Sequence, residues 1–226
     1  MKISSDVIDV FKNFVSINPS IYFKPDELNW VKSISPVGNI IALYNIEDKP
    51  FPCEFGIADL NQFLPLTVLF NMEEAEIDFK ENYMIIHCLD SRIKYYYASL
   101  DCFPIFQSMK SPDTYLKKSS FDADIVLTQD NIQKIKKISN VIGIYDMVIS
   151  VSLGETAKIE LRDKNQSTMN ELTIDIGCFS GNGSISLNIK NLNVISGDYK
   201  CGIINDKFIR LSSNDNKLFY FISASI

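Results

Sequence analysis

The sequence predicts an α+β protein made of two similar halves, and three observations carry this prediction. An amphipathic helix over residues 5–16 is followed by strand-like segments, a second helix signal and more strands. The same order begins again near residue 123, with its leading helix over 129–140. The 226 residues also suit two compact domains of roughly 110 residues each. Duplication of one α+β unit explains the repeated order, whereas two unrelated domains would share it only by accident.

The first half contains two helix signals. Ser4 or Ser5 can cap the first helix. Its apolar side chains share one face and its polar side chains the other, the latter being Asp9, Lys12, Asn13 and Ser16. The second signal, over 58–70, opens with Asp59 as its cap. Pro65 should bend or shorten this helix, because proline removes a backbone donor. Strands rich in β-branched and aromatic residues are expected at 20–24, 27–34, 38–46, 51–56, 75–79, 82–89 and 92–98.

Residues 99–121 lose all periodicity and gather prolines and serines, which is typical of a connector between domains. We therefore expect a first domain over 1–105, a connector over 106–121 and a second domain over 122–226.

The second half begins with a strand at 123–127 and a helix that follows Thr128. Further strands are expected near 144–152, 156–162, 169–178, 198–204, 207–212 and 217–223. The glycine-rich segment GCFSGNGS is interpreted as a hairpin turn, since it lacks the Gly-Lys-Ser/Thr of a phosphate-binding loop. A short helix is predicted at 188–195, although SISLNIKNL also reads as one long strand.

Lysines lie on the polar faces of these helices although the chain is acidic, with a net charge of −6. In the helix after Thr128, four isoleucines form an apolar stripe (Ile132, Ile135, Ile138 and Ile142). The opposite face carries Gln133, Lys136, Lys137 and Asn140. Lys190 and Asn193 face outward in the same way from 188–195. Basic residues confined to particular helices favour local contact with phosphate. The alternative is an ordinary solvated helix face.

The sequence offers no organised set of reactive groups. His87 is the single histidine, so neither a histidine-rich metal site nor a Ser-His dyad can be assembled. We expect a non-enzymatic protein with no cofactor and no metal. The five cysteines lie singly in apolar segments, which favours reduced, buried thiols in the cytoplasm. No apolar run approaches the ~18–20 residues that span a bilayer, and no membrane partner is expected.

Three segments resemble one known family. The opening MKISSDVIDVFKNFVSINPSI resembles the start of the sliding clamps of T-even-type bacteriophages, which are DNA polymerase processivity factors. IADLNQFLPL (57–66) resembles the Asp-Leu-Asn-x-Phe-Leu helix of that family, and SGDYKCGII (196–204) resembles its Gly-Asn-Tyr-Lys strand. The order of helices and strands agrees over essentially the whole chain. Pro65 departs from the small residue common at that place.

The resemblance implies a ring of three copies around duplex DNA. Each copy would have two similar DNA-clamp domains, with antiparallel sheets outside and two helices inside. The residues that would face DNA, without reading its sequence, are Lys12, Lys134, Lys136, Lys137, Lys190, Asn13, Gln133, Asn140 and Asn193, with Lys2 flanking them. Because Asp9 lies beside Lys12, the first domain would contribute less attraction.

The resemblance also implies partners. These are a DNA polymerase, an ATPase that loads the clamp, two further copies of the chain and possible phage transcription factors, all in the cytoplasm of an infected host. A partner peptide would dock beside the connector on Phe103, Phe106, Tyr115 and Phe121, unless these aromatics are core. A non-catalytic peptide-binding scaffold that encircles nothing is the alternative function, and an enzyme with a cryptic site ranks third.

Overall fold

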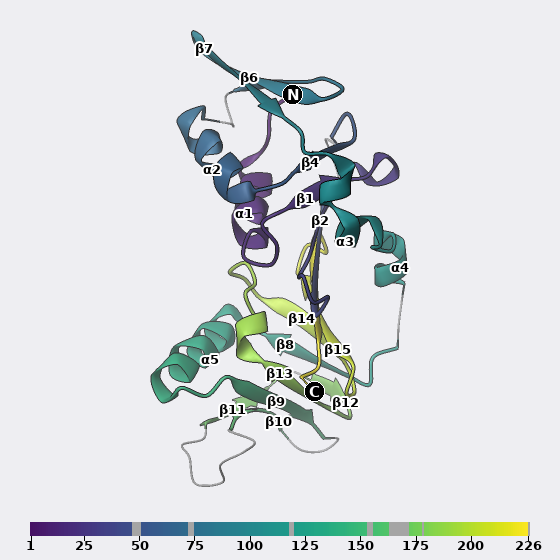
Figure 1. Cartoon of the computed structure of the whole chain (residues 1–226). Helices are drawn as coiled ribbons and strands as arrows, with labels where there is room; N and C mark the ends of the chain where they lie inside the picture. The colour runs from purple at the N-terminus through teal and green to yellow at the C-terminus, as the bar shows by residue number, and fades with distance from the viewer. Residues whose placement is uncertain are drawn as a thin grey trace. The chain divides into compact units, whose positions relative to one another are not determined.

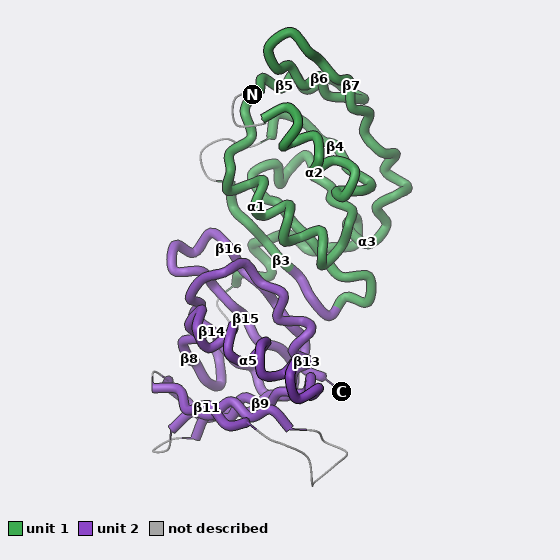
Figure 2. The backbone as a smooth tube through the Cα atoms, turned by 90° about the vertical axis from the view of Figure 1, so that its left-hand side faces the viewer, with its two compact units in different colours: residues 1–38, 42–117 green, residues 39–41, 118–226 purple. Residues whose placement is uncertain are grey.

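The computed structural model describes residues 1–46, 51–71, 75–117, 120–152, 156–162, 172–177 and 179–225. The chain forms two compact units (Figure 2). Unit 1 comprises residues 1–38 and 42–117, and unit 2 comprises residues 39–41 and 118–226. The α+β class predicted from the sequence is confirmed, because both units combine helices with antiparallel sheets.

Two helices of unit 1 pack against each other, α1 (Ser5–Phe14) and α2 (Leu60–Leu69) (Figure 1). α1 buries the predicted apolar face, from Val7 to Phe14. Asp59 caps α2 as predicted, accepting the Asn61 N–H at 2.9 Å. α2 runs through Pro65 and is not shortened. The carbonyl that loses its helical donor belongs to Asn61, which is exposed, so water can satisfy it.

The strands of unit 1 are β1 (Ile21–Phe23), β2 (Trp30–Ile34), β3 (Ile40–Asn45), β4 (Phe55–Ile57), β5 (Glu76–Phe79), β6 (Tyr83–Cys88) and β7 (Ser91–Tyr96). β1 pairs with β4, β2 lies beside β3, and β5-β6-β7 form an antiparallel meander. The first residues of β3 cluster with unit 2. A 3₁₀ turn, η1 (Pro25–Glu27), precedes β2.

An aromatic cluster fills the core of unit 1. Phe23 stacks on Phe55 with ring centroids 4.3 Å apart, and Phe51 packs against both rings. Phe11 and Phe63 bring α1 and α2 into the same cluster. Burial of such rings is the main force that holds the short strands of this unit together.

The predicted connector contains short helices rather than irregular chain. These are η2 (Leu100–Cys102), α3 (Pro104–Gln107) and α4 (Pro112–Leu116). The Lys24 ammonium donates to the Gln107 and Met109 carbonyls, at 3.1 Å each, and so holds the end of α3 against the segment that follows β1. Residues as far as 117 cluster with unit 1, while residues 118–119 of the predicted connector lie outside the described part.

Unit 2 contains two antiparallel sheets. One has the order β11-β10-β9-β13, formed by β11 (Leu172–Ile176), β10 (Ala157–Leu161), β9 (Asp146–Val151) and β13 (Gly183–Asn188). The other includes β12-β8-β14-β15-β16, formed by β12 (Phe179–Gly181), β8 (Ala123–Leu127), β14 (Tyr199–Ile204), β15 (Phe208–Ser213) and β16 (Leu218–Ser223). Apolar side chains from both sheets are buried in this unit, including Ile149, Ile159 and Cys201.

The predicted hairpin at the glycine-rich segment is wrong. β12 pairs with β8 and β13 pairs with β9, so the chain leaves one sheet and enters the other at Asn182. Gly181 has φ +85°, and a Cβ on it would lie 2.2 Å from the Asp122 carbonyl oxygen. The glycine is therefore required for the crossing and not for a hairpin.

Unit 2 has one long helix, α5 (Gln129–Ile142), as predicted. The second helix expected at 188–195 is wrong. The strand alternative holds as far as Asn188, and only a 3₁₀ turn, η3 (Ile189–Asn191), follows. The resemblance implied two helices in each domain. Unit 1 contains both, whereas the described part of unit 2 contains the helix α5 and, in place of a second helix, the 3₁₀ turn η3.

The cysteines are less buried than expected. Cys201 is buried, Cys53 and Cys88 are half-buried and Cys102 is exposed, all as free thiols. Burial raises the pKa of the Cys201 thiol and keeps it protonated. Cys178 lies outside the described residues.

Candidate functional site

The predicted basic helix α5 is held by caps at both ends. The Thr128 hydroxyl accepts the Asn131 N–H at 3.2 Å, and the Asp198 carboxylate accepts the Gln129 N–H at 2.7 Å. At the other end, Gly143 adopts the left-handed conformation and donates to the Ser139 carbonyl at 2.9 Å. These contacts fix which side chains α5 presents to solvent.

The buried face of α5 differs in part from the predicted isoleucine stripe. Ile132 and Ile135 are buried as expected, but Ile138 and Ile142 are half-buried. Ser139 takes the central buried place, where its hydroxyl donates to the Ile144 carbonyl. The buried face is therefore centred between Ile132 and Ser139, which brings Lys136 to its rim.

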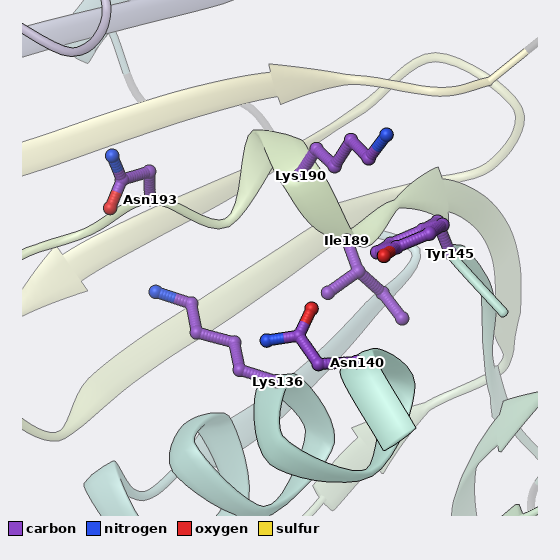
Figure 3. A pocket seen from close by; sticks show the side chains of 6 residues that line it. All are labelled: Lys136, Asn140, Tyr145, Ile189, Lys190 and Asn193. Carbon is purple, nitrogen blue, oxygen red and sulfur yellow. The ribbon is translucent and has the colours of Figure 1, made fainter. Parts of the chain in front are cut away.

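A pocket of about 270 Å³ lies between α5 and η3. Lys136 and Asn140 project into it from α5, while the chain at η3 contributes the opposite wall (Figure 3). Its six lining residues are Lys136, Asn140, Tyr145, Ile189, Lys190 and Asn193. Four of the nine residues predicted to face DNA are thus gathered here, and no lining residue is acidic.

The two lysines of this pocket have different surroundings. The Lys190 ammonium lies over the Tyr145 ring, 4.3 Å from its centroid, in a cation–π contact. Burial lowers the pKa of Lys136, because a desolvated ammonium is less stable than a hydrated one. In the described part of the chain, neither lysine forms a salt bridge. The site can therefore attract an anion without first breaking an ion pair.

The remaining predicted residues of α5 do not line the pocket. Gln133, Lys134 and Lys137 are exposed on the same helix. Their charges extend the basic surface beyond the pocket, which is consistent with a diffuse attraction for a polyanion.

In unit 1 the predicted residues Lys12 and Asn13 lie on α1. The Lys12 ammonium contacts the Asp9 carboxylate at 2.8 Å, with both side chains more than half exposed. Asn13 is half-buried, and Lys2 is exposed near the N-terminus. α2 carries no charged residue. The helices of unit 1 therefore present a nearly neutral surface.

Tyr145 and Ile189 belong to the pocket but were not singled out from the sequence. Tyr145 follows the C-terminal glycine of α5 by two residues, so its position depends on the turn at Gly143. In the sequence, Tyr145 is an aromatic residue next to a basic helix. That pattern is the same for a core residue and for a residue that lines a pocket.

Two of the four predicted docking aromatics are core residues. Phe103 is 0% exposed and stacks on Tyr22 with ring centroids 5.4 Å apart, and Phe106 is 1% exposed. A Cβ at Gly56 would lie 2.3 Å from the Phe103 ring, which shows how tightly the ring is enclosed. The alternative that the connector aromatics are core residues is therefore correct for Phe103 and Phe106, and neither is accessible to a peptide. Tyr115 and Phe121 are half-buried, and the Arg210 guanidinium lies over the Phe121 ring at 4.4 Å.

The described residues contain no group of three or more histidine, cysteine or carboxylate side chains that could hold a metal ion. No helix within the described ranges has the length and hydrophobicity to cross a bilayer. The chemistry that the pocket residues support is binding, through ammonium, amide and phenol groups that donate hydrogen bonds.

Comparison with known proteins agrees with the resemblance found in the sequence. A family model described as DNA polymerase processivity factor matches residues 4–101. The sliding clamp of Vibrio phage KVP40 is 26% identical over 209 residues, which cover 90% of each chain. The sliding clamp of Enterobacteria phage T4 is 25% identical over 207 residues, covering 88% of this chain and 86% of that one. These matches support the resemblance of the chain to the sliding clamps of T-even-type phages.

Solved structures agree on the fold. The proliferating cellular nuclear antigen of Entamoeba histolytica matches with a TM-score of 0.70 at 12% identity, covering 97% of this chain and 95% of that one. The A. fulgidus PCNA, solved with the C-terminal region of FEN-1 bound, matches with a TM-score of 0.72 at 11% identity, covering 97% and 94%. The clamp fold that the resemblance implied is therefore present, and the function of the chain is that of a sliding clamp and processivity factor.

Proposed function

We propose that three copies of this chain close into a ring around duplex DNA and tether the replicative polymerase to its template, without catalysis by the chain itself. The two units would be the two clamp domains of each copy, with residues 106–121 as the connector. Loading onto DNA would require a separate ATPase in the cytoplasm of the infected host.

The observation that carries this proposal is the gathering of Lys136 and Lys190 in one pocket that no acid lines. Flexible ammonium and amide groups attract phosphates of any sequence, as a protein that moves along DNA requires. The rest of the surface is acidic on balance, since the net charge of the chain is −6. Repulsion by that surface would favour DNA in the basic channel over DNA bound outside.

Ring closure would rely on open sheet edges. β7 in unit 1 and β11 in unit 2 each pair on one side only among the described strands. An open edge can continue its ladder with a strand of another copy, and a head-to-tail contact of this kind closes into a ring when the rotation permits. Retention on DNA would then be topological, so that weak contacts suffice.

Encirclement is tested by comparing retention on circular DNA, which has no ends, with retention on linear DNA. The protein is loaded with a clamp-loader ATPase and ATP onto nicked circular DNA, transferred to high salt, and assayed for retention before and after the circle is linearised. We expect it to stay on circles and to run off linear DNA. Equal rates of loss from both would contradict encirclement and favour a scaffold that binds partners without surrounding DNA.

A further inference from the structure

Arg210 in β15 lacks a hydrogen-bond acceptor among the described residues. It lies between Ile209 and Leu211, which are both 0% exposed, so strand alternation places its side chain on the face of the sheet that points away from this core. The Arg210 Nε is buried and without a hydrogen bond in the described part of the chain. No described carboxylate forms a salt bridge with the guanidinium. A partly desolvated positive charge is therefore left without an anion.

The Phe121 ring holds this arginine in place. The guanidinium lies over the ring, 4.4 Å from its centroid, in a cation–π contact. The ring itself rests on Gly202 of β14, where a Cβ would lie 2.6 Å from it. Gly202 pairs with Arg210 on one side and with Asp124 of β8 on the other, so the ring lies over the middle of three adjacent strands. The missing side chain of Gly202 therefore leaves the space in which the ring lies beneath the guanidinium.

The surroundings of Arg210 are apolar along β15 and acidic across the sheet. Phe208, two residues earlier in the strand, is half-buried and packs against Phe221 with ring centroids 6.1 Å apart. Asp124 is exposed and does not form a salt bridge with Arg210. Burial lowers the pKa of Arg210, and the negative charge of Asp124 opposes this shift. Asp124 thus favours the charged guanidinium without pairing with it.

A carboxylate is the acceptor that suits an arginine in this setting. The guanidinium presents a planar fork of N–H donors, and a carboxylate accepts two of them in parallel. Partial exclusion of water strengthens such a pair. Arginine and aromatic side chains also contribute much of the binding energy in protein interfaces. Because Phe121 and Phe208 adjoin Arg210, the ligand should carry an apolar group beside its carboxylate.

We propose that Arg210 and Phe121 form a binding site for the carboxylate of an acidic residue in a protein partner, with Phe208 contacting the apolar residue next to it. The site follows the direction of β15, as an extended protein segment requires. Binding here needs neither DNA nor a closed ring. The inference therefore goes beyond the proposed function, and it can fail or succeed independently of encirclement.

The three arginines of the chain, Arg92, Arg162 and Arg210, allow a direct test. The protein is titrated with hydrocinnamate, which joins a carboxylate to an aromatic ring, and with its neutral analogue hydrocinnamamide. NMR follows the Nε–Hε signals of the arginines, and the spectrum of Arg210→Gln assigns the signal of Arg210. We expect hydrocinnamate to shift this signal with a Kd on the order of a few millimolar, as a ligand of this size permits. The amide should leave the signal in place.

Arg92 and Arg162 are exposed and serve as internal controls. An Arg210 shift no larger than theirs would show only general ion pairing and would overturn the inference. Asp124→Asn should tighten the binding of hydrocinnamate roughly twofold, because it removes a nearby negative charge. An unchanged Kd in this variant would contradict binding beside Asp124. Should Arg210→Gln fail to fold, Arg92→Lys and Arg162→Lys assign the Arg210 signal by elimination.

Peptide selection tests whether the ligand belongs to a protein. Displayed random peptides are selected on immobilised wild-type protein, with excess Arg210→Gln protein in solution as competitor. We expect the selected peptides to carry aspartate or glutamate beside an aromatic or aliphatic residue, and to bind Arg210→Gln about tenfold more weakly. Selected peptides without a carboxylate, or equal binding to both proteins, would overturn the inference. Binding of hydrocinnamate without selection of such peptides would assign the site to a free carboxylate and refute a protein partner. Circular dichroism and melting curves establish that the variants are folded.

Discussion

Lys32 in β2 is a lysine without solvent contact. Its ammonium pairs with Glu27 from η1, and its side chain is 0% exposed while that of Glu27 is 13% exposed. Burial lowers the pKa of Lys32, and the hydrogen bond that its ammonium donates to the Glu27 carboxylate opposes this shift. Strand alternation predicts Lys32 outward and Val31 inward, but β2 is covered on both faces and buries both residues.

We expect Glu27→Gln to destabilise the protein by about 3 kcal/mol at neutral pH, because it leaves a buried ammonium without its counter-charge. The deficit should shrink as pH rises. In the variant the folded-state pKa of Lys32 falls further, while the unfolded value stays near 10.4. Between those values the unfolded chain binds more protons, so the free energy of unfolding increases with pH. Urea unfolding from about pH 7 to pH 10 measures this.

The control is Lys32→Met in the Glu27→Gln background, which removes the titrating group and fills similar volume. The free energy of unfolding of this double variant should not show the increase with pH that is expected for Glu27→Gln alone. A deficit of Glu27→Gln that stays constant across the pH range would show that Lys32 does not titrate as described.

Single residues of the candidate site were predictable where helical periodicity decides exposure. Lys137 and Gln133 lie on the exposed face of α5 because the 3.6-residue repeat places them opposite Ile135. Phe103 could not be placed from the sequence, since its burial depends on Gly56, 47 positions earlier in the numbering, leaving room for the ring. Contacts of this range are set by tertiary packing and leave no local pattern.

Among the elements, α5 and η3 show where local signals suffice. α5 combines a capping threonine, a periodic apolar face and a terminal glycine. Both caps are present in the structure, and the apolar face is buried at Ile132 and Ile135. Residues 188–195 also show apolar spacing, but the Ile189 N–H donates to the Tyr145 carbonyl at 2.8 Å and continues the pairing of β13 with the chain before β9. At the other end of this segment, the Ile195 N–H donates to the Tyr220 hydroxyl at 3.1 Å instead of to the Asn191 carbonyl of a helix.

The C-terminal glycine of α5 gives a prediction for this element. Gly143 has φ +71° and open space around its missing Cβ, so alanine there brings backbone strain without a clash. We expect Gly143→Ala to lower the free energy of unfolding by about 1 kcal/mol, and Gly143→Asn by less, because asparagine tolerates the left-handed region. Thermal unfolding followed by circular dichroism measures both.

Gly177→Ala is the matched control for this prediction. Gly177 also has open space around a Cβ but lacks a positive φ. Its replacement should leave the melting temperature nearly unchanged. If Gly143→Ala is as stable as Gly177→Ala, the left-handed cap does not contribute to the stability of α5.

For the whole molecule, the question is which sheet edges are open. In unit 1 the edge at β5 is occupied, because the Ile77 N–H donates to the Met1 carbonyl at 2.8 Å and the Met1 ammonium donates back at 2.9 Å. In unit 2 the edge at β13 is occupied by the Asn205 side chain, which accepts from the Ser184 N–H at 2.7 Å. Among the described strands, β7 and β11 pair on one side only, as do β1, β2, β4 and β12. The sequence predicted strands at both places but not their order in the sheets.

The outward groups of β7 follow from its pairing with β6. The Tyr97 N–H donates to the Asn82 carbonyl at 3.1 Å, and Ser91 lies opposite Cys88 across a two-residue turn. Because hydrogen-bonded pairs alternate along an antiparallel ladder, the odd-numbered residues bond to β6. The backbone groups of Arg92, Lys94 and Tyr96 therefore point to the free edge, where a second copy would pair.

Lys94→Pro tests this junction, because proline removes one outward N–H and leaves the bonds between β6 and β7 intact. We expect the variant to be folded and monomeric, while the wild-type protein runs near three times 25.7 kDa. Size-exclusion chromatography with light scattering over a concentration series measures this.

Lys94→Ala is the control. It loses the contacts of the ammonium with the Tyr83 and Tyr96 rings but keeps the backbone N–H, so it should stay trimeric. A trimeric proline variant would exclude β7 as the pairing edge, and a monomeric alanine variant would assign the junction to the lysine side chain instead.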